Sequence, residues 1–306
     1  MALGDLLGSD ISEPSNDKNL IEGRAIEARR LQKEELEFWE RQKRSGVESD
    51  LKMARDLPDD TPDFILGMLG DFENEAAKFC FSGAEGRVLD AGCGNGNLML
   101  RALKSDSAVG RATEFIGMDF SRNMLERAAF RAADAPRAAF LQGSVTCLPF
   151  QDQSFDWVAS SGVLTCLPDS EAASLALQEF YRVLKPGGVL VVDFFNRISH
   201  YTLIRKHLFR ESIKPPEYVS PSEFRKCLES AGFQVQAYRG FDFKPFQGYL
   251  FMSRWRPVVD PYFLQELLSS YLERRIIPRL PKANLLGYRI YVKCIKKPLN
   301  PAEKED

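Results

Sequence analysis

A glycine-rich stretch that follows an apolar run is the part of this sequence best suited to chemistry. Residues 88–97 read VLDAGCGNGN, with Gly92, Gly94 and Gly96 at alternate positions and Asp90 two residues before the first of them. Glycine adopts positive φ and has no Cβ, so a ligand can lie directly against the main chain there. A dinucleotide, a phosphate, a methyl-donor nucleotide and a tight turn alone would all fit this pattern.

The spacing and the charge of this stretch narrow the choice. A dinucleotide site favours G-x-G-x-x-G, with the pyrophosphate resting on a helix N-terminus, whereas the sequence here is G-x-G-x-G. The carboxylate of Asp90 would repel a phosphate, but it would attract a ligand that carries an ammonium and a sulfonium. The sign of the charge therefore favours S-adenosylmethionine (AdoMet) over NAD.

A second acidic residue, Asp119, lies 23 residues after Gly96, at the end of an apolar run. A carboxylate at that position can accept hydrogen bonds from both hydroxyls of a ribose. NAD-binding proteins use the same arrangement, so this residue does not discriminate between the two cofactors. The alternative is a helix cap or a surface acid, although Ser121 already suits the cap.

Four segments in order resemble the class I AdoMet-dependent methyltransferases, and especially the small-molecule group that contains the ubiquinone and menaquinone biosynthesis enzymes. They read VLDAGCGNG, FIGMDFSRNML, LQGSVTCLPFQDQSFDWV and FYRVLKPGGVLVV. The resemblance runs from about Gly86 to Val192. It implies a methyltransferase that binds AdoMet, with the methionine end against Asp90 and the three glycines, and the ribose on Asp119.

The resemblance also implies further cofactor contacts. These are Phe120 and Met124 beside the adenine, Ser144 and Val145 in the following loop, and Ser160 and Ser161 beneath the cofactor. Phe120 suits a plain core position equally well. Many relatives carry an acid where this chain has Ser144, so we expect a weaker adenine contact.

A catalytic base is harder to identify. Methyl transfer depends mainly on positioning the two reactants and excluding water, and it needs a base only for a weakly acidic acceptor. Relatives often carry histidines after the fourth strand, where this chain has Thr165 and Cys166. The chain has two histidines, and we take His200 as the candidate base, although a surface role in a basic helix is the alternative.

Alternating apolar runs and helical patterns surround these residues, which predicts an α/β fold: a doubly wound, seven-stranded, mostly parallel, Rossmann-like sheet. Expected strands are 87–91, 114–119, 139–142, 156–160, 188–194, 233–239 and 288–295. Expected helices are 61–79, 96–103, 121–133, 169–184 and 221–231. Ligands bind such sheets at the carboxyl ends of the strands, where VLDAGCGNGN falls.

Outside this core we expect a disordered tail over residues 1–17, a helical cap over 18–80 and a second tail over 299–306. The methyltransferase domain would then span 81–298, with insertions at 195–219 and 244–286. An apolar stripe runs from Leu264 to Leu272 and ends in basic residues. It suits a helix packed on the sheet, a lid over the acceptor, or a peripheral membrane contact.

Composition limits the partners. The formal net charge is −2 and residues 1–80 carry an acidic excess, so we expect no nucleic-acid partner. The six cysteines include no C-x-x-C pair, which favours reduced thiols in a cytoplasmic protein without a metal site. We see no secretory signal and no transmembrane segment.

The acceptor is therefore expected to be a small molecule, apolar or aromatic. The Asn/Asp-Pro-Pro-aromatic motif of nucleobase amine methylation is absent at 160–163, where the chain reads SSGV. The atom that is methylated and the oligomeric state stay open. Two other hypotheses remain at this point: a non-catalytic AdoMet-binding partner subunit and a nicotinamide oxidoreductase.

Overall fold

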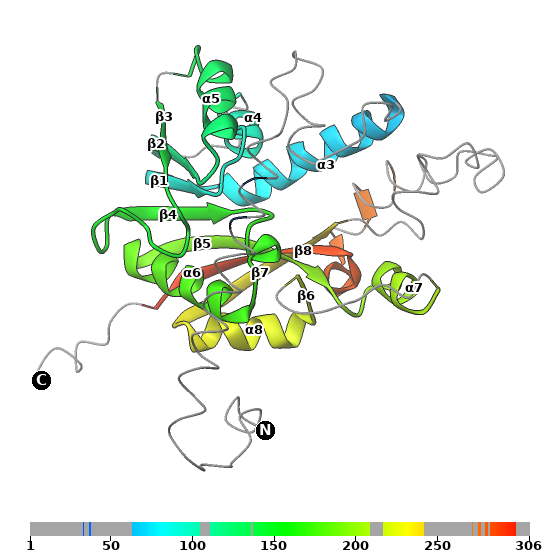
Figure 1. Cartoon of the computed structure of the whole chain (residues 1–306). Helices are drawn as coiled ribbons and strands as arrows, with labels where there is room; N and C mark the ends of the chain where they lie inside the picture. Colours follow the sequence, from blue (N-terminus) through cyan, green and yellow to red (C-terminus); the bar gives the residue numbers. More distant parts are fainter. Residues whose placement is uncertain are drawn as a thin grey trace, which may run out of the picture.

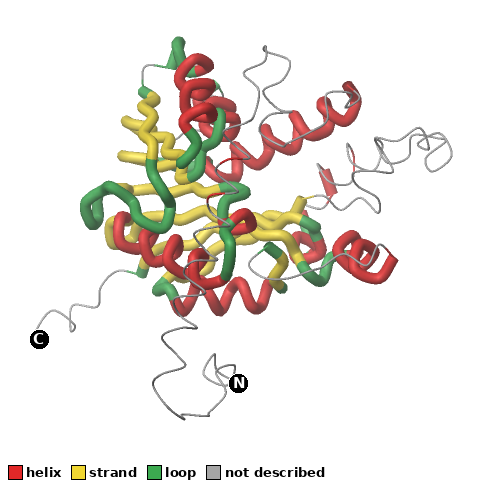
Figure 2. The backbone as a smooth tube through the Cα atoms, viewed as in Figure 1, coloured by secondary structure: helices red, strands yellow, loops and turns green. Residues whose placement is uncertain are grey.

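A computed structural model describes residues 63–104, 111–135, 137–208, 217–241 and 282–297, together with positions 33, 37, 271, 275–276 and 279–280. These residues form an eight-stranded sheet with helices on both sides (Figures 1 and 2). The expected tails lie outside the described residues, as do most of the 18–80 cap and most of the 244–286 insertion, including all of the stripe 264–272 except position 271.

The sheet has the strand order β3-β2-β1-β4-β5-β8-β7, and the short β6 pairs with the end of β5. All neighbouring pairs up to β5 are parallel, whereas β8 runs antiparallel to both β5 and β7. The strands are β1 (Glu85–Ala91), β2 (Arg111–Asp119), β3 (Ala138–Gln142), β4 (Phe155–Ser160), β5 (Leu184–Asn196), β6 (Tyr218–Val219), β7 (Phe233–Phe241) and β8 (Arg289–Lys296). The expected doubly wound, mostly parallel sheet is confirmed, and β6 is an additional strand.

Helices connect these strands. They are α3 (Asp63–Phe81), α4 (Asn97–Leu103), α5 (Arg122–Arg131), α6 (Ser170–Val183), α7 (His200–Leu208) and α8 (Pro221–Ser230), with 3-10 turns η3 (Leu164–Cys166) and η6 (Ala283–Leu286). Side-chain caps start three of the helices. Ser121 accepts from the Met124 amide at α5, Asp169 caps α6, and Ser220 forms a capping box with Glu223 at α8.

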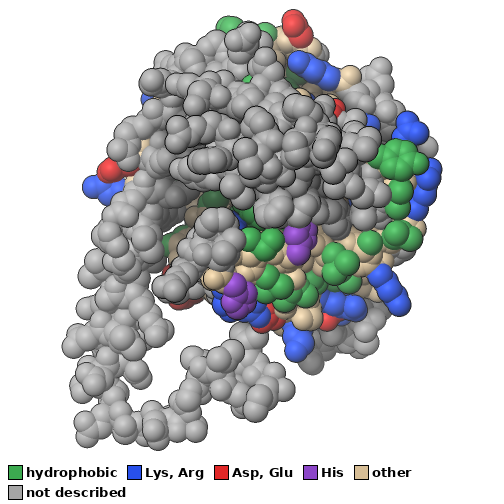
Figure 3. All heavy atoms as spheres, turned by 90° about the vertical axis from the view of Figure 1, so that its right-hand side faces the viewer, with side chains coloured by type: hydrophobic (Ala, Val, Ile, Leu, Met, Phe, Trp, Pro, Cys, Tyr) green, Lys and Arg blue, Asp and Glu red, His purple; other side chains and the backbone are tan. Residues whose placement is uncertain are grey.

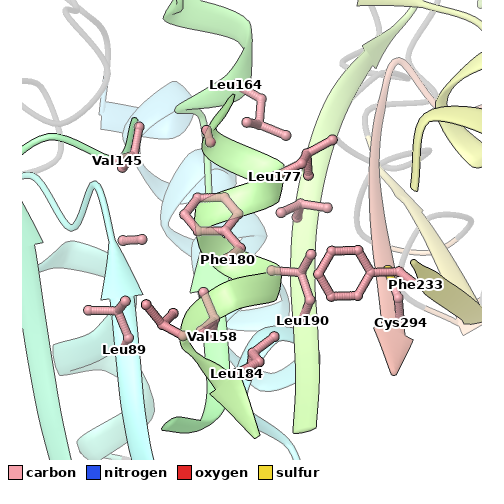
Figure 4. Close-up of a cluster of buried hydrophobic side chains, with 14 of the residues drawn as sticks. Leu89, Val145, Val158, Leu164, Leu177, Phe180, Leu184, Leu190, Phe233 and Cys294 are labelled. Carbon is pink, nitrogen blue, oxygen red and sulfur yellow. The ribbon is translucent and has the colours of Figure 1, made fainter. Parts of the chain in front are cut away.

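The central strands are buried on both faces. Val88 and Leu89 are neighbours in β1 and both are fully buried, although their side chains point to opposite faces. Val88 belongs to a cluster with α3 and α4, and Leu89 belongs to the cluster with α6 and α8. Figure 4 shows this second cluster, in which Phe180 and Leu177 of α6 lie among strand residues such as Leu190. Covering both faces leaves the strand ends as the place where a ligand can enter.

One turn was predicted wrongly. We expected Lys185–Gly188 to form a turn between the preceding helix and a strand that begins at Gly188. In the structure β5 already begins at Leu184, which pairs with Phe155, while Trp157 pairs with Val189. The intervening residues form a bulge inside β5, and Gly187 supplies the positive φ of 78° that the bulge requires. Lys185 stabilises it by donating to both carboxylate oxygens of Asp156 at 2.8 Å.

The packing of α6 yields a stability prediction. Phe180 is fully buried in the cluster, so Phe180→Ala should lower the free energy of unfolding by about 3–5 kcal/mol. Phe130 on α5 is 69% exposed and is the matched control, with an expected loss below about 1 kcal/mol. Urea unfolding followed by tryptophan fluorescence measures both. Equal losses in the two variants would contradict the assigned position of α6.

Candidate active site

The glycine stretch forms a turn between β1 and α4, as expected. Gly92, Gly94 and Gly96 have φ values of 77°, 53° and 73°, which ordinary residues rarely adopt. The amides of Gly92 and Cys93 donate to the carbonyl of Met118 at 2.7 and 2.9 Å, so the turn is fastened to the end of β2. The turn therefore has a fixed shape without any ligand.

The glycines differ in what surrounds them. A Cβ on Gly92 would lie 2.1 Å from Cγ2 of Val163, so the loop after β4 presses directly on this position. A Cβ on Gly94 would meet nothing within 4 Å, although its φ is also positive. Gly92 is needed for packing within the protein, whereas Gly94 leaves open space in front of the main chain.

A cavity of about 480 Å³ lies in front of this turn. Its size falls within the usual range for small-molecule sites. The predicted cofactor residues that line it are Asp90, Gly92, Gly94, Asp119, Phe120, Met124, Ser144, Val145 and Ser161. Gly96 and Ser160 do not line it: Gly96 instead caps α4, and Ser160 Oγ is buried without a hydrogen-bond partner among the described residues.

Asp119 is positioned by two backbone amides. Gly94 N donates to its Oδ2 at 2.8 Å, and Ser121 N donates to its Oδ1 at 2.9 Å. These contacts join the end of β2 to the glycine turn. The side chain is nearly buried but still lines the cavity, where a carboxylate can accept hydrogen bonds from a ligand.

Asp90 is a buried carboxylate that lacks full pairing within the protein. It is 1% exposed, and no described residue donates a hydrogen bond to its Oδ2. Burial, together with the negative charge of Asp119, raises the pKa of Asp90 to about 7. An unpaired buried carboxylate is costly unless a cation pairs with it. The turn, the open space at Gly94 and this carboxylate together fit a ligand with a positively charged end, as AdoMet has.

The opposite part of the cavity contains a residue that sequence reasoning missed, Arg289. This guanidinium is 6% exposed and its Nε donates to Asp193 Oδ2 at 2.5 Å. The other Asp193 oxygen accepts from Gly162 N at 2.6 Å. Burial alone would lower the pKa of Arg289, but the adjacent Asp193 raises it, so the side chain stays charged. The sequence does carry a signal for it, because Arg289 is a charged residue at the first position of the largely apolar run RIYVKCI.

Ser161 connects Arg289 to the end of β4. Arg289 Nη2 donates to Ser161 Oγ at 3.1 Å, and this oxygen lies 2.7 Å from the hydroxyl of Tyr291. Asp193 acts through these neighbours and does not itself line the cavity. Asn196, at the end of β5, donates to the carbonyls of Leu285 and Gly287.

The predicted base, His200, begins α7 and is not among the residues that line the cavity. Figure 3, which shows the face that lies at the right in Figure 1, has histidine side chains at the surface. The catalytic role of His200 therefore stays a prediction that the geometry of the cavity does not support. Ser144 lines the cavity as expected, and its Oγ lies 2.9 Å from Thr146 Oγ1.

A parallel sheet with a glycine turn and two carboxylates at its carboxyl edge defines an α/β nucleotide-binding protein. Residues 82–232 match the family model described as a methyltransferase domain. The demethylmenaquinone methyltransferase of Staphylococcus aureus is 40% identical over 178 residues, which cover 51% of this chain and 70% of the relative. The chain belongs to the class I AdoMet-dependent methyltransferases. The nicotinamide oxidoreductase hypothesis has no support in these matches.

Similarity to a solved structure agrees on the fold. A chain from the Haloferax volcanii complex between a methyltransferase activator and a methyltransferase is 21% identical, with a TM-score of 0.52, over 74% of this chain and 89% of that chain. None of the helices in the described part of the chain is long and apolar enough to cross a membrane.

The two glycine environments yield a paired prediction. Gly92→Ala should lower the free energy of unfolding by about 2 kcal/mol or more, because the new Cβ would overlap Val163. Gly94→Ala should cost only about 1 kcal/mol of stability but weaken AdoMet binding at least about tenfold, because its Cβ enters the cavity. Thermal unfolding and titration calorimetry measure the two effects. Unchanged AdoMet affinity in Gly94→Ala would remove this turn from the cofactor site.

The raised pKa of Asp90 yields a prediction of pH dependence. The folded state keeps a proton on Asp90 up to about pH 7, whereas the unfolded chain releases it near 3.8. The stability of the ligand-free protein therefore falls as pH rises through this window. Relative to the wild type, Asp90→Asn should therefore gain about 2–3 kcal/mol of stability between pH 5 and pH 8.

The same substitution should weaken AdoMet binding, because it removes the negative charge that the cationic end would meet. Wild-type affinity should rise from pH 6 to pH 8 as Asp90 ionises. Urea unfolding and calorimetry at these pH values test both effects. A stability difference that does not depend on pH would show that Asp90 is not the titrating group.

Proposed function

We propose that this methyltransferase transfers the methyl group of AdoMet to a small aromatic acceptor that carries a ring oxygen, as a phenol or hydroquinone does. The observation that carries the proposal is the composition of the cavity. Beyond the carboxylates, the apolar side chains of its wall include Val163, Leu167, Pro168 and the ring of Phe195, and Arg289 is the described basic side chain there. Apolar surface with a small number of polar contacts suits a flat ring.

The name of the Staphylococcus relative supports the same acceptor class. That enzyme is named for demethylmenaquinone, and it matches this chain at 40% identity over 178 residues. The matched region is 51% of this chain, so the remaining residues are free to favour a different ring or tail. We therefore propose the class of acceptor and not that particular compound.

The charges in the cavity support a neutral acceptor over a polyanion. Among the described residues that line it, four carry carboxylates (Glu73, Asp90, Asp119 and Glu217) and one is an arginine. A nucleic acid or a phosphorylated metabolite would meet net repulsion there. The positive charge of AdoMet, in contrast, would be attracted.

AdoMet supplies an electrophilic methyl group when it is bound. In our proposal Asp90 pairs with its cationic end, Gly94 leaves room for it, and Asp119 accepts hydrogen bonds from its ribose. Phe120 and Met124 would flank the adenine, and Ser144 and Val145 would face its edge. Ser161, with Val163, would separate the cofactor from the acceptor and exclude water, so the protein contributes mainly positioning.

A methyl-transfer assay tests this function. The purified protein is incubated with methyl-labelled AdoMet and with reduced 1,4-naphthoquinone, 1-naphthol, yeast RNA or a histone mixture as the acceptor. Label should appear in a naphthalene product and in neither polymer. Asp119→Ala should lower AdoMet affinity at least about tenfold. Labelling of RNA or protein, with none of the ring compounds, would overturn the proposed acceptor class.

A further inference from the structure

Arg289 has hydrogen-bonding capacity that the protein leaves unused. Its Nε and Nη2 are engaged by Asp193 and Ser161, but no described residue accepts a hydrogen bond from Nη1. Nη1 is not one of the fully buried polar atoms that lack a partner, so it keeps some exposed surface, and Arg289 lines the cavity. A side chain that is more than nine-tenths buried thus offers the unused N–H groups of Nη1 to the site.

The guanidinium is held in a fixed position. Three rings surround it: Tyr291, Phe195 and Phe72, with centroids 5.3, 5.7 and 5.8 Å from its Cζ. The ion pair with Asp193 fixes its plane from a further side. Such a group loses little conformational entropy when it binds a ligand, since its rotamer is already selected.

The position of Arg289 places it beside the glycine turn. A Cβ on Gly162 would lie 3.1 Å from Nη2, so this glycine lets the guanidinium approach the loop after β4. The next residue in that loop, Val163, presses on Gly92. Two successive loop residues therefore connect the proposed donor site with the guanidinium of Arg289.

The charges around Arg289 select the kind of group it can bind. Asp193 already neutralises it, and the charge of Glu73 acts on it as well. A ligand with two negative charges, such as a phosphate monoester, would be repelled by these carboxylates and by Asp90. A single phenolic oxygen requires only one hydrogen bond and at most one negative charge.

We propose that Arg289 Nη1 binds the ring oxygen of the methyl acceptor and favours its ionised form. This inference rests on the proposed function and assigns the polar contact of its acceptor. In the reaction the O–H bond of the phenol breaks, its proton goes to solvent water, and the oxygen keeps the electron pair. Ionisation raises the electron density on the oxygen and on the ring carbons ortho and para to it, so the oxygen or one of these carbons becomes a better nucleophile. No histidine is needed for this step.

Binding of matched probes tests the inference. The probes are 1-naphthol, naphthalene and 1-naphthyl phosphate, and their dissociation constants are measured by quenching of tryptophan fluorescence in the presence of AdoMet. The wild type should bind 1-naphthol at least about tenfold more tightly than naphthalene, because hydrogen bonds to charged groups are strong. It should bind 1-naphthyl phosphate more weakly than 1-naphthol.

Arg289→Met should reduce the preference for 1-naphthol over naphthalene to about twofold or less. That variant leaves Asp193 buried without its partner, so it is paired with the double variant Asp193→Asn/Arg289→Met, which removes both charges. Lys296→Met is the control. Lys296 is a buried cation at the other end of β8, donating to the carbonyls of Tyr181 and Leu184 at 2.7 Å. AdoMet affinity shows which variants are folded.

The expected result is loss of the 1-naphthol preference in the double variant and its retention in Lys296→Met, with AdoMet affinity within about threefold of the wild type in both. A preference that survives in the double variant, or that the wild type lacks, would overturn the role of Arg289. Tighter wild-type binding of 1-naphthyl phosphate than of 1-naphthol would do the same. If one of these binding results is obtained but the protein still methylates a naphthol, the role of Arg289 fails and the proposed function stands. Failure of the inference can therefore be distinguished from failure of the proposed function.

A kinetic measurement gives an independent readout. If the wild type methylates reduced 1,4-naphthoquinone, kcat at saturating acceptor should rise with pH until the bound hydroxyl is ionised. In the double variant this rise should move to higher pH, because the ionised oxygen has lost its stabilising contact. If the double variant is slower at every pH but its rate rises over the same pH range as that of the wild type, Arg289 has a structural role only.

Discussion

The central strands of this protein are covered by helices on both faces, and this constraint determines where chemistry can occur. A strand buried on both sides has no free face on which to bind a ligand. The loops at the carboxyl ends of β1, β2 and β4 therefore carry the functional groups, and these loops also hold one another in place. The glycine turn hydrogen-bonds to the carbonyl of Met118, and Gly92 packs against Val163. Site geometry thus follows directly from sheet packing.

Two carboxylates at this edge show a division of tasks. Asp119 accepts two backbone amides, so its negative charge is compensated by the protein. Asp90 is more deeply buried and one of its oxygens has no described partner. The buried carboxylate of Asp90 therefore destabilises the ligand-free protein, and it becomes favourable when a cationic ligand pairs with it. Stability and affinity are therefore opposed at a single residue, as is common in binding sites.

The sequence was sufficient to predict the sheet and the order of its elements, and most of the predicted cofactor residues line the cavity. Apolar periodicity specified the strands, and the glycine turn is a local feature whose residues are adjacent in the chain. The bulge in β5 was missed because its pairing partner Asp156 lies 29 residues away from Lys185. A turn pattern such as Lys-Pro-Gly-Gly does not reveal which strand will accommodate it.

Arg289 was missed for a related reason. Its partners Asp193 and Ser161 lie 96 and 128 residues earlier in the chain, and only the antiparallel insertion of β8 brings them together. Nothing within the run RIYVKCI indicates whether its first residue meets solvent or the cavity. The histidines posed the opposite problem, because their residue type suggested a base although the fold leaves them away from the lining. Residue type predicts chemistry only where the topology is known as well.

The place of β8 in the sheet has a consequence for how the protein is made. It lies between β5 and β7 in space, although it follows both in the chain. During synthesis, β7 has no partner strand until residues 289–296 have left the ribosome, whereas β1 to β5 can already pair. The half that carries the glycine turn can therefore take shape first, while the half that carries Arg289 is completed last. Under the roles proposed above, a growing chain would acquire the means to hold a methyl donor before it acquires the means to choose what is methylated.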